Sequence, residues 1–118
     1  GHALHHHCIW DAATRGWFPG DSFGSSCCEF ETARGAWMIP TTVPTQFDPP
    51  ALRASVQRLL AFAPECIYLT HYSRIVEVPR AAARLLAMMD AMVAIAERHR
   101  ATPERHATLE REASSTRA

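Results

Sequence analysis

The stretch WFPGDSF, residues 17–23, decides how the rest of the chain is interpreted. Its leading aromatic pair is typical of a short β-strand, and Pro19-Gly20 ends that strand in a turn. Asp21 then follows a strand end, where side chains project from a rigid edge into the crevice that usually holds the site of an α/β protein. Because Asp is also a common turn residue, a purely structural role is the alternative interpretation.

The residues before this stretch predict a partner strand. Residues 4–10 (Leu-His-His-His-Cys-Ile-Trp) have a strand-like composition, and a turn-like stretch at 11–16 joins them to the aromatic pair in a β-hairpin. In a strand, His5, His6 and His7 would face alternate sides, so we expect them to have no metal role, although His5 or His6 could line a site. A remnant of a purification tag is another source of such a run.

Residues 22–47 predict a long irregular segment. Gly, Ser, Thr and Pro are frequent there, and the apolar residues show no regular period. A loop of this length inside a small domain usually lines a site. We therefore expect substrate contacts in this segment, with Trp37 as a candidate.

The second half of the chain predicts two helices and a strand. Asp48 and Pro49 suit the N-cap and first position of a helix, which Pro64 ends. Residues 66–70 are typical of a buried strand, and a second helix is predicted from about Val78 to about Arg100. The expected buried residues are Leu52, Val56, Leu59, Leu60 and Ala63 in the first helix, and Leu85, Met89, Met92, Val93 and Ala96 in the second.

The predicted order of elements is β–β–loop–α–β–α, which indicates an α/β fold with a short sheet plus two helices. Two helices can cover only one face of such a sheet, so the other face would normally pack against something else. We assign residues 1–100 to this folded unit. Residues 101–118 are polar and predict a disordered tail.

Composition excludes several classes of function. The 118 residues carry a net charge of zero, so the chain has no electrostatic footprint for nucleic acid or an anionic membrane. Its apolar runs are far shorter than the roughly 20 residues that cross a bilayer. The four cysteines form no Cys-x-x-Cys pair, so we expect reduced thiols in a cytoplasmic protein.

Three residues at or just beyond the ends of predicted strands could hold a metal: His2, Asp21 and His71. Two imidazoles and a carboxylate suit zinc, iron or manganese. Scattered His and Asp residues occur in most proteins, however, so these residue types do not identify a metal site by themselves.

The sequence around each of the three residues resembles a ligand motif of the metallo-β-lactamase superfamily. Gly1-His2-Ala3 before a strand is similar to the family's "PGH" motif, and residues 17–23 are similar to its "F-x-GD-x-x-F" motif. Tyr68-Leu-Thr-His71-Tyr looks like its closing "THY" motif. The three occur in the family's order. Residues 40–49 also resemble a subgroup of uncharacterised hydrolases related to glyoxalase II.

The resemblance implies the C-terminal half of a four-layered α/β/β/α sandwich. In the complete fold two metals, normally zinc with iron or manganese possible, activate a water that hydrolyses an ester, thioester or related bond of a small-molecule substrate. The resemblance assigns His2 to the first metal, His71 to the second, and Asp21 to a bridge between them.

The chain also departs from the family in ways that affect function. Nothing in it matches the His-x-His-x-Asp-His motif, and Ser73 stands where the family often has Gly. Each metal would then have two protein ligands where a catalytic zinc normally has three, so we expect this fragment to be inactive. His2, one residue from the start, is expected to be poorly anchored.

Two other outcomes are compatible with the sequence. One is a non-catalytic α/β module that forms a homodimer through its uncovered sheet face, because an exposed apolar face of more than a few hundred Å² favours association. The other is a chain that does not fold stably when isolated.

Overall fold

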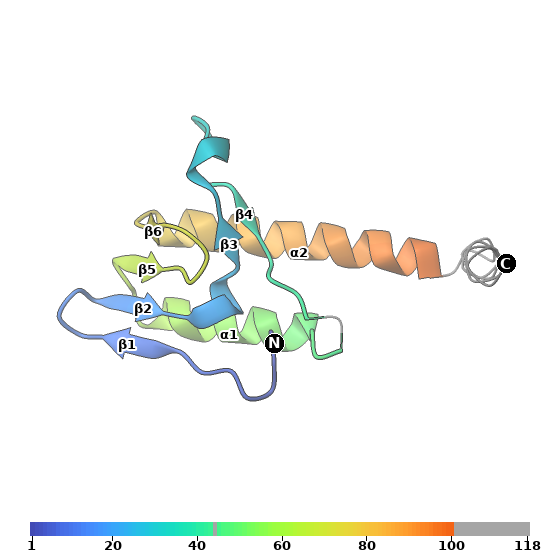
Figure 1. The fold of residues 1–118 in the computed structure, drawn as a ribbon, viewed down its shortest axis with the longest axis horizontal. Coiled ribbons are helices and arrows are strands. Elements are labelled where there is room, and N and C mark those ends of the chain that lie inside the picture. The colour runs from blue at the N-terminus through green and yellow to red at the C-terminus, as the bar shows by residue number, and fades with distance from the viewer. Residues whose placement is uncertain (44, 101–118) are drawn as a thin grey trace, which may run out of the picture.

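A small mixed sheet and two helices form the fold of residues 1–43 and 45–100, the part of the chain that the computed structural model describes (Figure 1). The sheet has the order β1-β2-β5-β6. Its strands are β1 (Ile9–Asp11), β2 (Gly16–Phe18), β5 (Cys66–Tyr68) and β6 (Arg74–Ile75). β2 and β5 run parallel, whereas both edge strands pair antiparallel to their neighbours. The predicted tail at 101–118 lies outside the described residues.

The predicted hairpin is confirmed, but its first strand is shorter than expected. Trp10 pairs with Trp17 across β1 and β2. The prediction that residues 4–8 also form strand was wrong. The chain turns there, with the backbone N–H of His6 donating to the carbonyl of Ala3, and the side chain of His6 contacts the backbone of Asp21. These contacts replace the ladder hydrogen bonds of an extended strand.

The segment predicted as irregular contains four short elements: the 3-10 helix η1 (Gly20–Phe23), β3 (Ser25–Ser26), the 3-10 helix η2 (Cys28–Phe30) and β4 (Met38–Ile39). β3 and β4 pair antiparallel as a separate two-stranded sheet. The buried Met38 in β4 packs in the core against the second helix, α2 (Val78–Arg100). Two-residue strands leave no periodic pattern, so this hairpin was not predicted.

The first helix, α1 (Pro49–Ala61), begins where the sequence predicts. The carboxylate of Asp48 accepts a hydrogen bond from the backbone N–H of Ala51 at 3.0 Å, as an N-cap does. Leu52, Val56 and Leu59 are buried as expected. The prediction for Ala63 was wrong, because it lies beyond the helix in the left-handed region (φ 48°) and is exposed.

The second helix, α2 (Val78–Arg100), also has the predicted bounds. Leu85 and Met89 are fully buried, but Met92 and Val93 are only half-buried and Ala96 is exposed. The expected apolar face is therefore wrong for the last turns. Figure 1 shows the reason: this half of α2 extends beyond the sheet, so no strand lies beneath it.

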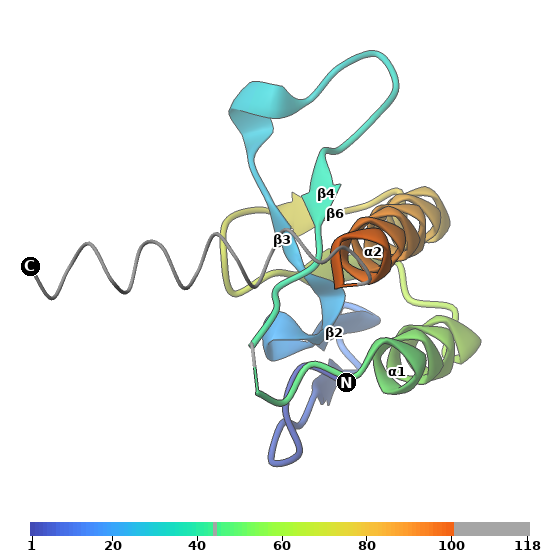
Figure 2. The same cartoon turned by 90° about the vertical axis from the view of Figure 1, so that its right-hand side faces the viewer.

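Both helices cover the same face of the four-stranded sheet (Figure 2). On this face the indole N–H of Trp17 donates to the carbonyl of Leu59 in α1 at 3.1 Å, and Ile67 is fully buried. On the opposite face Phe18 stacks on Tyr68, with ring centroids 4.6 Å apart, and remains 47% exposed. Within the described ranges neither helix has an apolar stretch long enough to cross a membrane.

Candidate metal site

The candidate site lies where β2 and β5 end. Because these strands are parallel, their carboxyl ends meet at the same edge of the sheet. Asp21 follows β2, in the first turn of η1, and His71 follows β5, in the turn that leads to β6. Strand ends therefore bring together two residues that are far apart in the sequence.

The third candidate, His2, reaches this edge from the start of the chain. The carbonyl of Gly1 accepts a hydrogen bond from the backbone N–H of Asp48 at 2.9 Å. A Cβ atom at Gly1 would lie only 2.0 Å from the backbone nitrogen of Leu52, so only glycine fits against the first turn of α1. His2 is 7% exposed. The expectation that His2 is poorly anchored was therefore wrong, because the Gly-His pair packs against a helix end.

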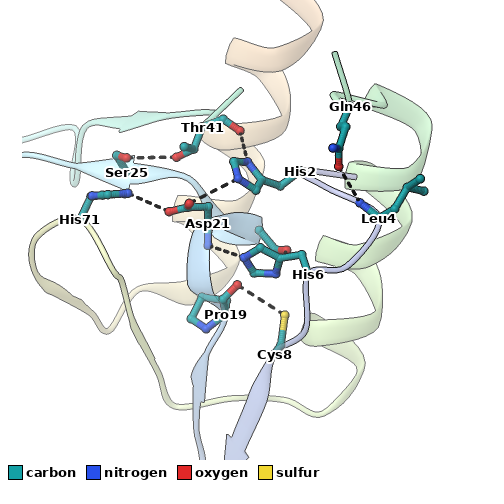
Figure 3. Close-up of polar contacts among 11 residues, drawn as sticks. His2, Leu4, His6, Cys8, Pro19, Asp21, Ser25, Thr41, Gln46 and His71 are labelled. Atoms are coloured by element: carbon teal, nitrogen blue, oxygen red, sulfur yellow. Dashed lines mark hydrogen bonds and ion pairs between the residues drawn. The ribbon is translucent and has the colours of Figure 1, made fainter. Parts of the chain in front are cut away.

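Both histidines approach the same carboxylate (Figure 3). The Nε2 atom of His2 lies 3.3 Å from Oδ2 of Asp21, and the Nε2 atom of His71 lies 2.8 Å from Oδ1. The side chain of His2 is 9% exposed and that of Asp21 24%, whereas that of His71 is 55% exposed. Asp21 thus lies between two imidazoles, each of which contacts a different carboxylate oxygen.

The protonation of His2 is constrained by its other ring nitrogen. Nδ1 lies 2.9 Å from the backbone carbonyl of Thr41. A carbonyl oxygen only accepts hydrogen bonds, so Nδ1 must carry the proton. Nε2 then either carries a second proton, forming an ion pair with Asp21, or directs its lone pair at a cation shared with the carboxylate. A backbone partner on the second nitrogen is the usual environment of a metal-ligating histidine.

Asp21 has an unsatisfied oxygen. Oδ1 is buried and has no hydrogen-bond partner among the described residues, although His71 Nε2 is 2.8 Å away. The two atoms are therefore close without the orientation of a hydrogen bond. A buried polar atom without a hydrogen-bond partner costs about 1–3 kcal/mol, and ion binding is one recognised role of such an atom. In residues 1–43 and 45–100, however, no group of three or more His, Cys, Asp or Glu side chains is arranged to hold a metal as it stands.

Sequence reasoning did not predict the role of His6. Its Nε2 accepts a hydrogen bond from the backbone N–H of Asp21 at 2.9 Å, and its Nδ1 lies 3.3 Å from Oγ of Ser22. Burial, followed by the neighbouring charge of His2, lowers the pKa of His6 below its ordinary value. His6 belongs to none of the three ligand motifs. The strand predicted for residues 4–10 also gave no reason to expect a contact between His6 and Asp21. His5 and His7 are exposed.

An open hollow of about 340 Å³ lies near the candidate site, but none of His2, Asp21 and His71 lines it. Three of its lining residues are next to a candidate ligand in sequence or in contact with one: Gly20, Thr70 and His6. The full lining consists of His5, His6, His7, Ile9, Phe18, Gly20 and Thr70. His5 and His6 line this hollow, and the interpretation that one of them lines a functional site stays a prediction.

Trp37 and Cys27, both from the long segment after β2, lie away from this hollow. Trp37, the candidate for a substrate contact, packs edge-on against Phe30, with ring centroids 5.4 Å apart. The thiol of Cys27 donates to Glu29 at 2.6 Å, and this hydrogen bond raises its pKa. A thiol held in its protonated form is a poor nucleophile.

Comparison of the chain with models of protein families, with curated proteins and with solved structures finds no match.

Proposed function

We propose that this chain supplies three ligands, His2, Asp21 and His71, to the metal centre of a hydrolase similar to the metallo-β-lactamase superfamily, of which it represents the C-terminal half. The observation that carries the proposal is the meeting of two distant histidines on the two oxygens of one half-buried carboxylate. Three motifs whose order matches the family's point to the same residues.

The spacing of one pair of atoms supports a shared cation. Two ligands of a tetrahedral zinc, each about 2.0–2.1 Å from the metal, are about 3.3 Å apart. His2 Nε2 and Asp21 Oδ2 are separated by 3.3 Å, and Asp21 Oδ1 has no hydrogen-bond partner among the described residues. The 2.8 Å between His71 Nε2 and Asp21 Oδ1 is shorter than this value, so the His71 side chain would move outward slightly for both atoms to bind the same cation. Its exposed side chain has room to do so.

Each residue has a distinct role in the proposed centre. His2, held through Nδ1 by the Thr41 carbonyl, presents Nε2 in a fixed direction. Asp21 provides the negative charge and one oxygen toward each imidazole. When bound, a zinc, iron or manganese ion would supply a Lewis acid that lowers the pKa of a coordinated water toward neutrality, which suits hydrolysis of an ester or thioester.

The chain alone provides only two protein ligands for each metal. We therefore expect it to bind zinc weakly and to have no hydrolase activity unless a segment with a His-x-His-x-Asp-His motif completes the centre.

A zinc titration at neutral pH, monitored by competition with a chromophoric chelator, tests the proposal. His2→Ala, Asp21→Ala and His71→Ala should each lower zinc affinity more than tenfold. Loss of a residue that only hydrogen-bonds to a metal ligand already lowers metal affinity about 10- to 100-fold. His5→Ala is the matched control, because His5 is an exposed histidine of the same segment, and it should leave the affinity unchanged. The metal centre is refuted if the three ligand variants bind zinc as tightly as His5→Ala does.

A second candidate function is a non-catalytic module that forms a homodimer. The observation that favours it is the uncovered sheet face, where Ile9 is 58% and Phe18 47% exposed beside the stacked ring of Tyr68. A second copy of the chain is the occupant we propose, since two-fold homodimers are the commonest assemblies and present the same patch from both sides.

Light scattering after size exclusion, in the presence of a chelator, tests the dimer. The homodimer interpretation predicts a dimer that Phe18→Asp dissociates. Phe30→Asp is the control, because Phe30 is equally apolar and 58% exposed but lies in η2, away from the four-stranded sheet. A monomer at all concentrations, or a dimer that both variants dissociate, contradicts this function.

A further inference from the structure

We propose that His6 is a positioning residue of the metal centre: it donates nothing to the metal, but its imidazole fixes the backbone that carries the Asp21 carboxylate. This inference rests on the proposed function and deepens it, because it adds a residue that the ligand motifs do not include.

The hydrogen bonds of His6 define its tautomer. The backbone N–H of Asp21 can only donate, so Nε2 of His6 is the acceptor in their 2.9 Å hydrogen bond. In the neutral ring the proton is then on Nδ1, which faces Oγ of Ser22 at 3.3 Å. Both nitrogens of His6 are thus used by the Asp21-Ser22 segment, and neither is available to bind a metal.

The ring also packs directly against the turn that leads into Asp21. Gly20 has φ 55°, in the left-handed region, and a Cβ atom there would lie 2.3 Å from Cε1 of His6. Glycine is therefore required both for the backbone conformation and for the close approach of the ring. The Gly-Asp pair of the motif and His6 form one packed unit.

His6 contacts the second candidate ligand as well. Its ring lies edge-on to that of His2, with centroids 5.4 Å apart and an interplanar angle of 82°. One imidazole thus touches the backbone of Asp21 and the side chain of His2. In the proposed centre Nε2 of His2 and Oδ2 of Asp21, 3.3 Å apart, bind the same cation. Figure 3 shows His6 on the side of Asp21 away from His71. Fixing two ligands relative to each other raises metal affinity without adding a donor atom, as outer-shell residues do.

Four variants, compared with Asp21→Ala and followed by two readouts, separate positioning from mere structural support. Zinc affinity is measured by chelator competition, and the melting temperature is measured on the metal-free chain. His6→Ala should lower zinc affinity about 10- to 100-fold, the usual effect of losing an outer-shell partner. His6→Gln should restore most of it, because the amide oxygen of Gln can accept from the Asp21 N–H in place of Nε2. His7→Ala removes an exposed neighbour and should have no effect.

Ile67→Val controls for destabilisation. Ile67 is fully buried in the centre of β5, and Ile→Val typically costs about 0.5–1.5 kcal/mol, so this variant should lower the melting temperature without changing zinc affinity.

The outcomes distinguish the inference from the proposed function. If Asp21→Ala weakens zinc binding but His6→Ala does not, the positioning role is overturned and the metal centre stands. If neither variant matters, both are overturned. If Ile67→Val weakens binding as much as His6→Ala, or if Gln does not restore it, His6 acts only through stability and the inference fails.

Discussion

The two imidazoles that contact Asp21 are held in opposite ways. His2 is buried, its Nδ1 is engaged by the Thr41 carbonyl, and its preceding glycine packs on the first turn of α1. His71 lies on an exposed turn in which the next two residues, Tyr72 and Ser73, both have positive φ (68° and 92°). One side of the carboxylate is thus built into the folded body, whereas the other is carried on a strained surface turn.

This difference indicates which contacts are preorganised. On the His2 side, donor atoms, tautomer and backbone are set by packing before any cation binds, whereas the position of His71 depends on the local turn between β5 and β6. Metal affinity and folding stability should therefore respond together to changes at His2 but separately to changes at His71. The following variants test that asymmetry.

Replacing Asp21 should have the largest effect, because it belongs to both sides. Asp21→Asn keeps the shape but removes the charge that both histidines face. We expect zinc affinity to fall more than about 100-fold, because a proposed ligand itself is altered. Loss of a residue that only hydrogen-bonds to a ligand lowers metal affinity by up to about 100-fold. Isothermal titration calorimetry with zinc measures this. Unchanged affinity in Asp21→Asn would remove the basis of the comparison.

His2→Ala should combine a loss of affinity with a loss of stability. The substitution leaves the part-buried carbonyl of Thr41 without its partner and opens space beside α1. We expect the free energy of unfolding to fall by about 1–3 kcal/mol, as for other unsatisfied buried groups. Urea denaturation of the metal-free chain measures it. A change below 0.5 kcal/mol would mean that His2 is not part of the core.

His71→Ala should separate the two properties. Zinc affinity should fall more than tenfold as for His2→Ala, but stability should change by less than about 0.5 kcal/mol because the side chain is largely exposed. The same titration and denaturation experiments apply. Equal destabilisation by His71→Ala and His2→Ala would show that the two sides are anchored alike, contrary to the structure.

Ser73→Gly should have the smallest effect and the opposite sign. Ser73 adopts φ 92°, which glycine tolerates without strain, so we expect a gain of about 0.5–1 kcal/mol in the free energy of unfolding. Thermal unfolding detects it as a higher melting temperature. A lower melting temperature would indicate that the hydrogen bond from Ser73 Oγ to the Arg74 carbonyl outweighs the backbone strain.

The sequence predicted those parts of the fold that local chemistry determines. Asp48 and Pro49 located the start of α1, and the apolar spacing located α2 and the strand at Cys66–Tyr68. β6 was missed, because two residues have no detectable period. The apolar pattern of α2 continues to Ala96, but burial also requires a surface beneath the helix, which local sequence does not report.

The candidate site shows the same limit. The strand-end positions of Asp21 and His71 could be predicted because a parallel sheet brings its carboxyl ends together. The anchoring of His2 could not, since it depends on a contact between Gly1 and Leu52, far along the chain. His6 was assigned to a strand by composition, and its contact with Asp21 arises only because the chain turns before β1.

The most direct test of the metal centre is a long-range ¹H–¹⁵N correlation spectrum of the imidazole nitrogens during a zinc titration. Zinc binding predicts that Nε2 of His2 and Nε2 of His71 shift to metal-bound values while Nδ1 of His2 stays protonated, hydrogen-bonded to Thr41. The resonances of His5 and His7 should not move. If Nε2 of His2 still carries a proton at saturating zinc, His2 and Asp21 form an ion pair, and the proposed metal centre is contradicted.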